Sequence, residues 1–355
     1  MQSIEKDEFY LNLCLQNAWQ NQILTLPNPS VSALVLDKYG AIISLESHQE
    51  CGKPHAEVLA LQKAYVNLSG DDAILLLKDS AQIHNYLIQH SKNLFRDSTI
   101  YVSLEPCSSL KCGETPSCAT LLKTIKIKRV VIAAQDIHKQ AKGGAEELEQ
   151  CGISVTKAWK SKNLTSINHK ANHLLLPFKS LQTKERFILY KYACRLDGSI
   201  NGGQISSKAA QEQIHNYRTR ANSLLISGKT IRIDKPILDT RFATLNSKDT
   251  PNVTILTNDK NFPRVAPLFN VSNREVKIVH NVDSLLHDAK GFIICEGGAG
   301  LFETLQPHID MLLIILNPSI NTKFSLSMRL NQSFHFAHSM QVGEDLFLWL
   351  LPKQI

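Results

Sequence analysis

The sequence lacks any stretch near the ~20 consecutive apolar residues that a membrane-spanning helix needs, so we do not expect this chain to be an integral membrane protein. It has no dense lysine and arginine tract of the kind found in nucleic-acid-binding arms, and no repeat or low-complexity segment. Its first ten residues carry Glu5, Asp7 and Glu8 before any apolar run, the wrong charge for a secretory signal. Eight cysteines are few for 355 residues and suggest no disulfide framework. These absences predict a cytoplasmic globular protein.

The composition is that of a folded chain of moderate size. The 355 residues are 43% hydrophobic and 20% charged, which suggests two domains at roughly 150 residues each. The net charge of +7 suits a nucleic acid or a phosphorylated small substrate, but an ordinary basic surface explains it as well.

Strand and helix patterns alternate along both halves, which indicates α/β sheets covered by helices. The mixed polar stretch 158–185 is the expected junction, so we place the domains at 1–157 and 158–355. In the first half we expect strands at 31–36, 41–45, 98–104, 129–134 and 153–156, and helices at 7–20, 55–68, 118–127 and 145–149. In the second half we expect strands at 187–193, 223–227, 252–256, 276–279, 292–295 and 311–316, and helices at 207–221 and 300–305.

The first half contains a candidate metal site. His55 and Cys118 each begin an expected helix, so two helix starts can deliver ligands to one ion. One imidazole and two thiolates suit tetrahedral zinc, and three protein ligands leave one position for water, as in catalytic sites. Glu57 would then carry protons between that water, the ring nitrogen and the leaving ammonia, as in zinc nucleobase deaminases with their H-x-E and P-C-x-x-C signature. No C-x-x-C is present, and Cys107, Cys112 and Cys118 compete for two ligand positions.

Four segments of the first half resemble the bifunctional riboflavin-biosynthesis proteins, in which a pyrimidine deaminase is fused to a pyrimidine reductase. They are Pro27-Asn28-Pro29, His55-Ala56-Glu57-Val58, Leu104-Glu105-Pro106-Cys107-Ser108 and Thr115-Pro116-Ser117-Cys118. The resemblance implies a cytidine-deaminase-like α/β/α sandwich. It also implies zinc on His55, Cys107 and Cys118, Glu57 as the catalytic proton carrier, and Asn28 and His48 in the substrate pocket.

The resemblance continues more weakly through the second half and implies a dihydrofolate-reductase-like α/β domain that uses NADPH. The segments that carry it are 193–198, 214–218, 230–238 with Arg241, and the glycine-rich turn 296–300. A glycine turn between a strand and a helix lets backbone N–H groups approach a phosphate, although an unliganded tight turn has the same pattern. By position, the implied cofactor-binding residues are Ala193, Thr230, Asp234, Gly298, Ala299, Gly300, Leu301 and Thr304. The implied residues for the substrate, a phosphorylated pyrimidine, are Arg218, Leu238, Arg241 and Glu296.

The sequence departs from this family in both halves. The cysteine segment is two residues longer, Glu114 replaces a basic residue whose role Lys111 could take over, and 69–97 is an insertion expected to be a helical surface excursion. In the second half Gln204 stands for a tryptophan, Arg195 for a polar residue and Gly202 for a serine. Asp197 is the residue expected to shape the pocket near the reacting carbon.

We therefore expect a two-step enzyme with zinc and NADPH, and with no nucleic-acid or membrane partner. Family members often self-associate, which implies a homo-oligomer. Three alternatives stay open: a deaminase with a degenerate reductase half, a nucleic-acid-editing zinc deaminase, and a non-catalytic protein whose zinc is closed by Cys112 as a fourth ligand.

Overall fold

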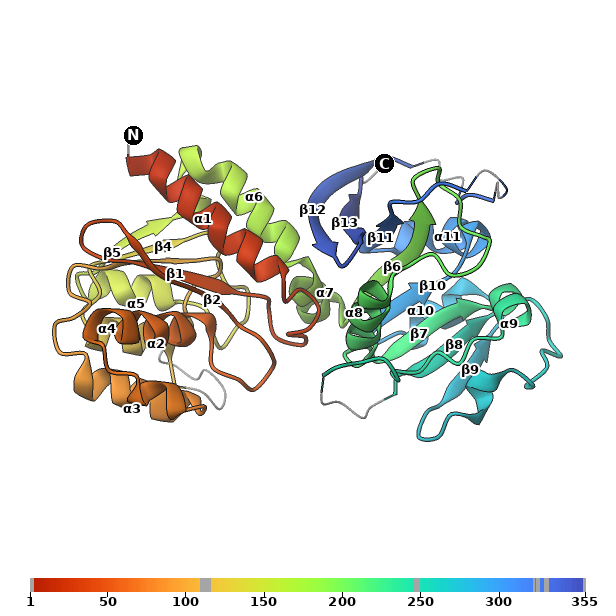
Figure 1. The fold of residues 1–355 in the computed structure, drawn as a ribbon, viewed down its shortest axis with the longest axis horizontal. Coiled ribbons are helices and arrows are strands. Elements are labelled where there is room, and N and C mark those ends of the chain that lie inside the picture. The colour runs from red at the N-terminus through yellow and green to blue at the C-terminus, as the bar shows by residue number, and fades with distance from the viewer. Residues whose placement is uncertain are drawn as a thin grey trace. The chain divides into compact units, whose positions relative to one another are not determined.

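The computed structural model describes residues 3–108, 116–245, 250–321, 323, 326–328 and 332–353. The chain divides into two compact units, Met1–Lys179 and Ser180–Ile355. The division comes later than the expected residue 157, because helix α6 (Thr165–Leu174) packs against α1 (Ser3–Trp19) of the first unit (Figure 1). The stretch expected to be a mixed junction is mainly helical. It contains η2 (Ala158–Lys160), η3 (Lys162–Leu164), α6 and α7 (Leu176–Lys184).

The first unit is built on a five-stranded sheet in the order β2-β1-β3-β4-β5. Strand β1 pairs antiparallel with β2 and β3, whereas β3, β4 and β5 are parallel. All five residues of β1 are buried, as expected for a strand that is covered on both faces. The bounds are β1 (Ser32–Leu36), β2 (Ile42–Ser47), β3 (Thr99–Val102), β4 (Arg129–Ile132) and β5 (Ser154–Lys157).

Helices cover both faces of this sheet, so the unit has three layers (Figure 1). Helices α1 and α6 lie on one face, and α2 (Ala56–Ser69), α4 (Cys118–Thr124) and α5 (Gly144–Gln150) lie on the other. Because β3, β4 and β5 are parallel, the segments that follow β3 and β4 emerge at the same end of the sheet. This end therefore collects the segments that follow Val102 and Ile132, and the metal-site motif lies there.

The insertion 69–97 is a packed part of the first unit and not the surface excursion expected from the sequence. It forms η1 (Ala73–Leu76) and α3 (Ser80–His90), and α3 packs against α2 and α4. Its side chains Ile83, Leu87 and Phe95 are at most 1% exposed. Gln62 of α2 also donates hydrogen bonds to two carbonyl oxygens of the insertion. The helical character was predicted correctly, but the burial was not.

The second unit contains an eight-stranded sheet in the order β12-β13-β11-β6-β10-β7-β8-β9. Neighbouring strands are parallel from β11 to β9, and the C-terminal hairpin of β12 and β13 adds antiparallel strands at the other edge. The strands are β6 (Arg186–Arg195), β7 (Ser223–Ser227), β8 (Asn252–Leu256), β9 (Val276–Val279), β10 (Gly291–Glu296), β11 (Met311–Asn317), β12 (Phe334–Val342) and β13 (Asp345–Pro352). The helices after α7 are α8 (Lys208–Arg218), α9 (Gly228–Asp234), η4 (Pro267–Asn270), α10 (Val282–Asp288), α11 (Ala299–Leu305) and η5 (Gln306–His308).

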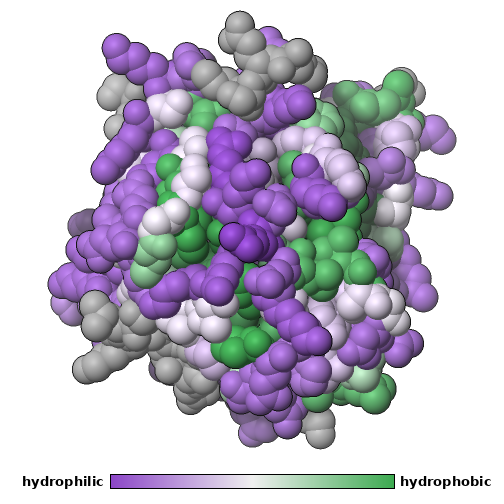
Figure 2. Space-filling model, turned by 90° about the vertical axis from the view of Figure 1, so that its left-hand side faces the viewer, coloured by the Kyte–Doolittle hydropathy of each residue, from purple (hydrophilic) through white to green (hydrophobic). Residues whose placement is uncertain are grey.

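The apolar strands and helices of this unit share one core. Tyr190 of β6, Phe302 of α11 and Leu312 of β11 are at most 1% exposed and belong to the same cluster. On the surface, Figure 2 shows the face on the first unit's side, where hydrophobic side chains lie in separate areas between hydrophilic ones. Within the described parts of the chain, no helix is long and apolar enough to cross a membrane.

Candidate active sites

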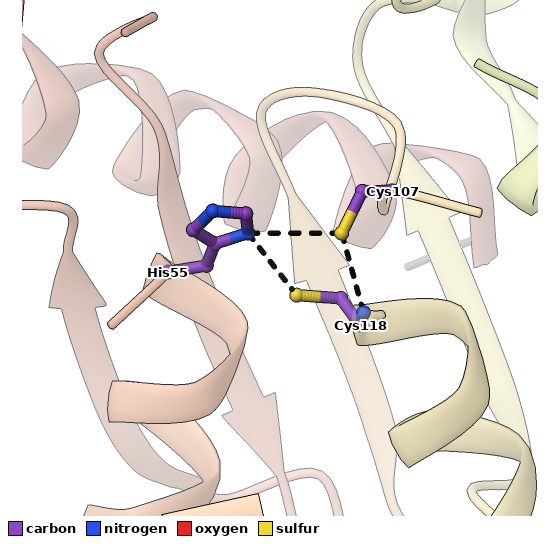
Figure 3. Close-up of side chains that lie close together, drawn as sticks. All are labelled: His55, Cys107 and Cys118. Carbon is purple, nitrogen blue, oxygen red and sulfur yellow. Dashed lines mark hydrogen bonds between the residues drawn. The ribbon is translucent and has the colours of Figure 1, made fainter. Parts of the chain in front are cut away.

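The three predicted metal ligands come together in the first unit (Figure 3). Nδ1 of His55 lies 3.4 Å from Sγ of Cys118 and 3.7 Å from Sγ of Cys107. All three ligand atoms lie within 4.8 Å of one another, and both cysteines are buried. Ligand atoms around a tetrahedral zinc ion are roughly 3.4–3.8 Å apart, given its bond lengths to nitrogen and sulfur. The donor types and their spacing therefore fit zinc.

Two helix starts and one loop hold these ligands, as the sequence predicted. His55 immediately precedes α2 with an extended backbone, and Cys118 is the first residue of α4. Ser117 caps α4 by accepting the N–H of Thr120, and its hydroxyl donates to the carbonyl oxygen of Cys107 at 2.9 Å. The backbone N–H of Cys118 donates to Sγ of Cys107 at 3.3 Å, an interaction that favours the thiolate a metal requires.

Glu57 lies in the first turn of α2 beside this cluster and is 4% exposed. Burial raises the pKa of its carboxyl group from 4.5 to about 7, although a hydrogen bond with Cys118 opposes the shift. The negative charge of Asp136 also raises this pKa. A carboxyl group that titrates near neutral pH can both accept and release a proton.

Asn28 and His48, implied by the family resemblance as substrate residues, lie next to the ligand His55. The rings of His48 and His55 meet edge to face, with centroids 5.8 Å apart. Nδ1 of His48 is 3.1 Å from the carbonyl oxygen of Pro54, which can only accept, so this nitrogen carries the proton. Nε2 of His48 is then free to accept from Nδ2 of Asn28, 3.4 Å away.

Two further residues near the site have no role in the sequence analysis. Glu105, 3% exposed, accepts backbone N–H groups of Asp136, Gly143 and Ala145 at 3.1, 3.2 and 3.0 Å. It thereby ties the segment before Cys107 to the loop after β4. The other residue is the buried His84 of α3. Burial is the main cause of the lowered pKa of His55, and the neighbouring imidazoles of His48 and His84 lower it further. Glu105 stood in a recognised motif, whereas nothing in the sequence pointed to His84.

The three remaining residues considered for this site, Lys111, Cys112 and Glu114, lie outside the described residues.

The second unit contains a large cleft of about 1190 Å³. Its walls come from the ends of β6, β7 and β10, from α9 and from the turn that leads into α11. The structure thus gathers into one cavity residues that are more than one hundred positions apart in the sequence. All the residues that the resemblance implies for the cofactor line it, namely Ala193, Thr230, Asp234, Gly298, Ala299, Gly300, Leu301 and Thr304.

Three of the four implied substrate residues of this half, Arg218, Leu238 and Glu296, also line the cleft. Nε and Nη2 of Arg218 donate to the two carboxylate oxygens of Glu296, each at 2.9 Å. Lys191 adds a second cation at 3.4 Å, and these charges hold the pKa of Glu296 well below its usual range. Arg218 is thus bound to Glu296 in a two-pronged ion pair.

Two other expected residues of this half, Arg241 and Asp197, are not among the described residues that line the cleft. Arg241 is half-exposed, and its Nε is 3.1 Å from Oδ1 of Asp239. Asp197 accepts the hydroxyl and the backbone N–H of Ser199 and the backbone N–H of Asn321. Its carboxylate therefore ties the turn after β6 to a later segment of the unit.

Comparison with known families divides the chain as the structure does. Residues 4–134 match the cytidine and deoxycytidylate deaminase zinc-binding region, and residues 186–345 match the RibD C-terminal domain. The riboflavin biosynthesis protein RibD of Aquifex aeolicus is 33% identical over 245 residues, which cover 67% of this chain and 58% of that protein. RibD of Bacillus amyloliquefaciens is 26% identical over 397 aligned residues, covering 98% of this chain and 96% of that protein.

Solved structures show the same fold over both units. The Thermotoga maritima diaminohydroxyphosphoribosylaminopyrimidine deaminase/5-amino-6-(5-phosphoribosylamino)uracil reductase has a TM-score of 0.65 at 21% identity, over 99% of each chain. Acinetobacter baumannii RibD has a TM-score of 0.62 at 21% identity, covering 99% of this chain and all of that one. These likenesses and the two domain matches confirm the expected two-domain α/β fold. Because a deaminase zinc-binding region is followed here by a RibD C-terminal domain, and because relatives align over nearly the whole chain, this chain belongs to the RibD family of riboflavin-biosynthesis proteins.

Proposed function

We propose that this chain catalyses two consecutive steps of riboflavin biosynthesis. The first unit hydrolyses the exocyclic amine of 2,5-diamino-6-(ribosylamino)pyrimidinone 5′-phosphate. Water supplies the new oxygen, and ammonia leaves. The second unit then transfers a hydride from NADPH to C1 of the ribosyl group. The bond from C1 to the ring oxygen breaks, that oxygen takes up a proton, and a ribitylamino chain results.

The observation that carries the first step is the cluster of the partly exposed His55 with the buried Cys107 and Cys118, and Glu57 beside it. One nitrogen and two sulfur donors would hold zinc with one coordination position left open. Zinc bound there supplies the Lewis acidity that activates a water molecule for hydrolysis.

The protein's own contribution to this step is proton transfer and orientation. Glu57 is buried and its carboxyl group has a pKa of about 7, so it can take a proton and return it to the ring nitrogen and to the leaving amine. Asn28 and His48 lie beside His55 as a hydrogen-bonded pair and are suited to orient the pyrimidine. The alignment of substrate and acid matters because a misplaced reactant loses most of the rate advantage.

The cleft of the second unit fits the second step. At about 1190 Å³ it is larger than the ~300–1,000 Å³ typical of sites for one small ligand, so it has room for a dinucleotide and a substrate. Bound NADPH would supply the hydride. Residues of α9 and of the turn into α11 would hold the cofactor, and Leu238 would lie on the substrate side. Arg218 would reach the substrate phosphate only as part of its pair with Glu296.

The first test removes the proton carrier. Glu57→Gln should lower ammonia release by at least about 100-fold, while zinc content and melting temperature stay at the wild-type values. Glu5→Gln, the same chemical change at an exposed position of α1, is the matched control and should release ammonia normally. Loss of zinc from Glu57→Gln would contradict a role restricted to proton transfer.

The second test is a paired assay on the zinc-loaded protein with the diaminopyrimidine phosphate. Ammonia release without NADPH, followed by NADPH oxidation when it is added, would support both steps and their order. Ammonia release without oxidation would favour the deaminase with a degenerate reductase half. Neither signal, with zinc bound, would refute the proposal and favour a closed zinc site or a nucleic-acid substrate.

Location and assembly belong to the same proposal. A phosphorylated small substrate and NADPH are consistent with a cytoplasmic enzyme that has no nucleic-acid partner. The family resemblance further implies that the enzyme forms homo-oligomers. Light scattering would measure the assembly, and tight salt-dependent RNA binding would count against the proposed substrate.

A further inference from the structure

One wall of the cleft in the second unit is a short loop that follows β6. Residues from Ile200 to Ser206 line the cleft, as does the turn into α11. The start of the loop is held by a backbone hydrogen bond from Ile200 to Leu326 at 2.9 Å. Its end leads into Ser207, which caps α8 and whose N–H donates to the buried carboxylate of Asp345. The middle of the loop needs another support.

Arg195, the last residue of β6, supplies that support. Its side chain is buried, and Nη1 donates to the carbonyl oxygen of Asn201 at 2.7 Å. Nη2 lies 3.4 Å from the carbonyl oxygen of Gly202, and Nη1 also reaches Oγ of Ser199 at 3.5 Å. One guanidinium group thus contacts the backbone carbonyls of two adjacent loop residues and the side chain of Ser199. Arg195 itself is not among the residues that line the cleft.

The conformation of the loop depends on glycine at the point that Arg195 contacts. Gly202 and Gly203 both have φ of +91°, a left-handed conformation that other residues adopt at a cost. This conformation brings the carbonyl oxygens of Asn201 and Gly202 toward the guanidinium group. The arginine at 195 and the glycine at 202, which look like separate departures from the family in the sequence, are therefore in direct contact.

Burying an arginine side chain carries a free-energy cost that an apolar side chain would not. Among the described residues, no carboxylate forms an ion pair with Arg195. Its guanidinium group donates to two backbone carbonyls and one hydroxyl. Burying a cation against neutral acceptors costs more free energy than burying a neutral side chain of similar size. The forked guanidinium group instead offers several donors in fixed directions, which suits a role in setting backbone geometry.

We propose that Arg195 is a positioning residue for the reductase step, holding the loop 200–206 in the shape that bound NADPH and the pyrimidine require. This inference rests on the proposed function of the second unit. Without Arg195 the loop would have to become ordered when NADPH binds, and the apparent affinity would fall by the fraction of time the loop is ordered.

The test compares Arg195→Ala, Arg195→Lys and a control in the full-length zinc-loaded protein. Arg195→Ala should raise KM for NADPH by about tenfold while kcat of reduction changes by less than about threefold. Arg195→Lys should fall between, because a lysine keeps the charge but lacks the rigid fork whose two nitrogens contact Asn201 and Gly202 separately. The matched control is Arg186→Ala at the other end of β6, where Nη1 also donates to a carbonyl oxygen but far from the cleft lining. It should leave both constants unchanged.

Two further readouts separate positioning from general stability. Ammonia release by the first unit should be the same in all variants, and limited cleavage of the apo protein by subtilisin should become faster within 200–206 only when Arg195 is replaced. An unchanged KM with unchanged cleavage would overturn the proposal, as would a joint loss of both activities with a lower melting temperature. If the wild-type protein oxidised no NADPH, the proposed reductase function would fail, and the cleavage comparison would still decide whether Arg195 holds the loop.

Discussion

Replacing Glu105 by glutamine should loosen the metal site without touching a ligand. The carboxylate lies two residues before Cys107 and accepts three backbone N–H groups. Oε1 accepts from Gly143 and Ala145, and Oε2 accepts from Asp136. The amide oxygen of glutamine can replace Oε1, but its NH2 group would then face the N–H of Asp136. One hydrogen bond is lost and two donors are left opposed in a buried place.

The expected cost follows from these contacts. A hydrogen bond to a charged acceptor contributes about 1.5–3 kcal/mol, and a buried unsatisfied donor costs a similar amount. We therefore expect Glu105→Gln to lower the free energy of unfolding of the first unit by about 2–3 kcal/mol, and Glu105→Ala, which removes all three bonds, by about twice that. Since the same segment carries Cys107, both variants should also retain less zinc after dialysis against a weak chelator.

Urea unfolding at pH 7.5, followed by circular dichroism, would measure the first effect, and metal analysis of the dialysed protein the second. The control is again Glu5→Gln, whose exposed side chain should change the free energy of unfolding by less than about 0.5 kcal/mol. Wild-type stability and zinc content in both Glu105 variants would refute the reasoning. A stable Glu105→Gln beside an unstable Glu105→Ala would show that side-chain packing, and not the carboxylate, holds the loop.

Three other predictions test separate contacts. Gly144→Ala would place a Cβ 1.9 Å from the carbonyl oxygen of Pro106, so the segment that carries Cys107 must move. We expect the free energy of unfolding to fall by about 1–3 kcal/mol and zinc to be retained less well. An unchanged melting temperature would contradict this close packing. Glu296→Gln would leave the Arg218 guanidinium without its buried counter-charge. The free energy of unfolding of the second unit, measured with urea, should fall by about 3–5 kcal/mol. An unchanged free energy of unfolding would mean that water solvates the pair. Burial, helped by Arg218, lowers the pKa of His215 to about 4 from 6.5. The unfolded chain therefore binds the extra proton between pH 6.5 and 4, and the stability present above pH 6.5 is lost as the pH falls through this range. His215→Gln should flatten that slope in unfolding measured from pH 7.5 to 4, and an equal slope would contradict the assignment.

Much of the first unit could be predicted from local sequence. The ligands His55 and Cys118 stand at helix starts, and a helix start is visible in the residue pattern. Residue chemistry alone does not decide which two of the three cysteines bind the metal. The family resemblance selects Cys107 and Cys118, and the structure describes only these two of the three. The packing of the insertion could not be predicted. A short amphipathic helix such as α3 has the same pattern whether its apolar face meets α2 and α4 or another surface.

The second unit shows why its site was harder to predict. The cleft residues Ala193, Thr230 and Gly298 come from three separate strand ends, and only the strand order brings them together. Local patterns contain no strand order, so only the resemblance placed these residues in one site. The same resemblance made Arg195 and Gly202 look like two defects, because a position-by-position comparison treats each residue separately. In the structure they are a donor and an acceptor 3.4 Å apart. A departure from a family pattern is thus weak evidence for lost function until the partners of the new side chain are known, and here one of those partners is the second departure itself.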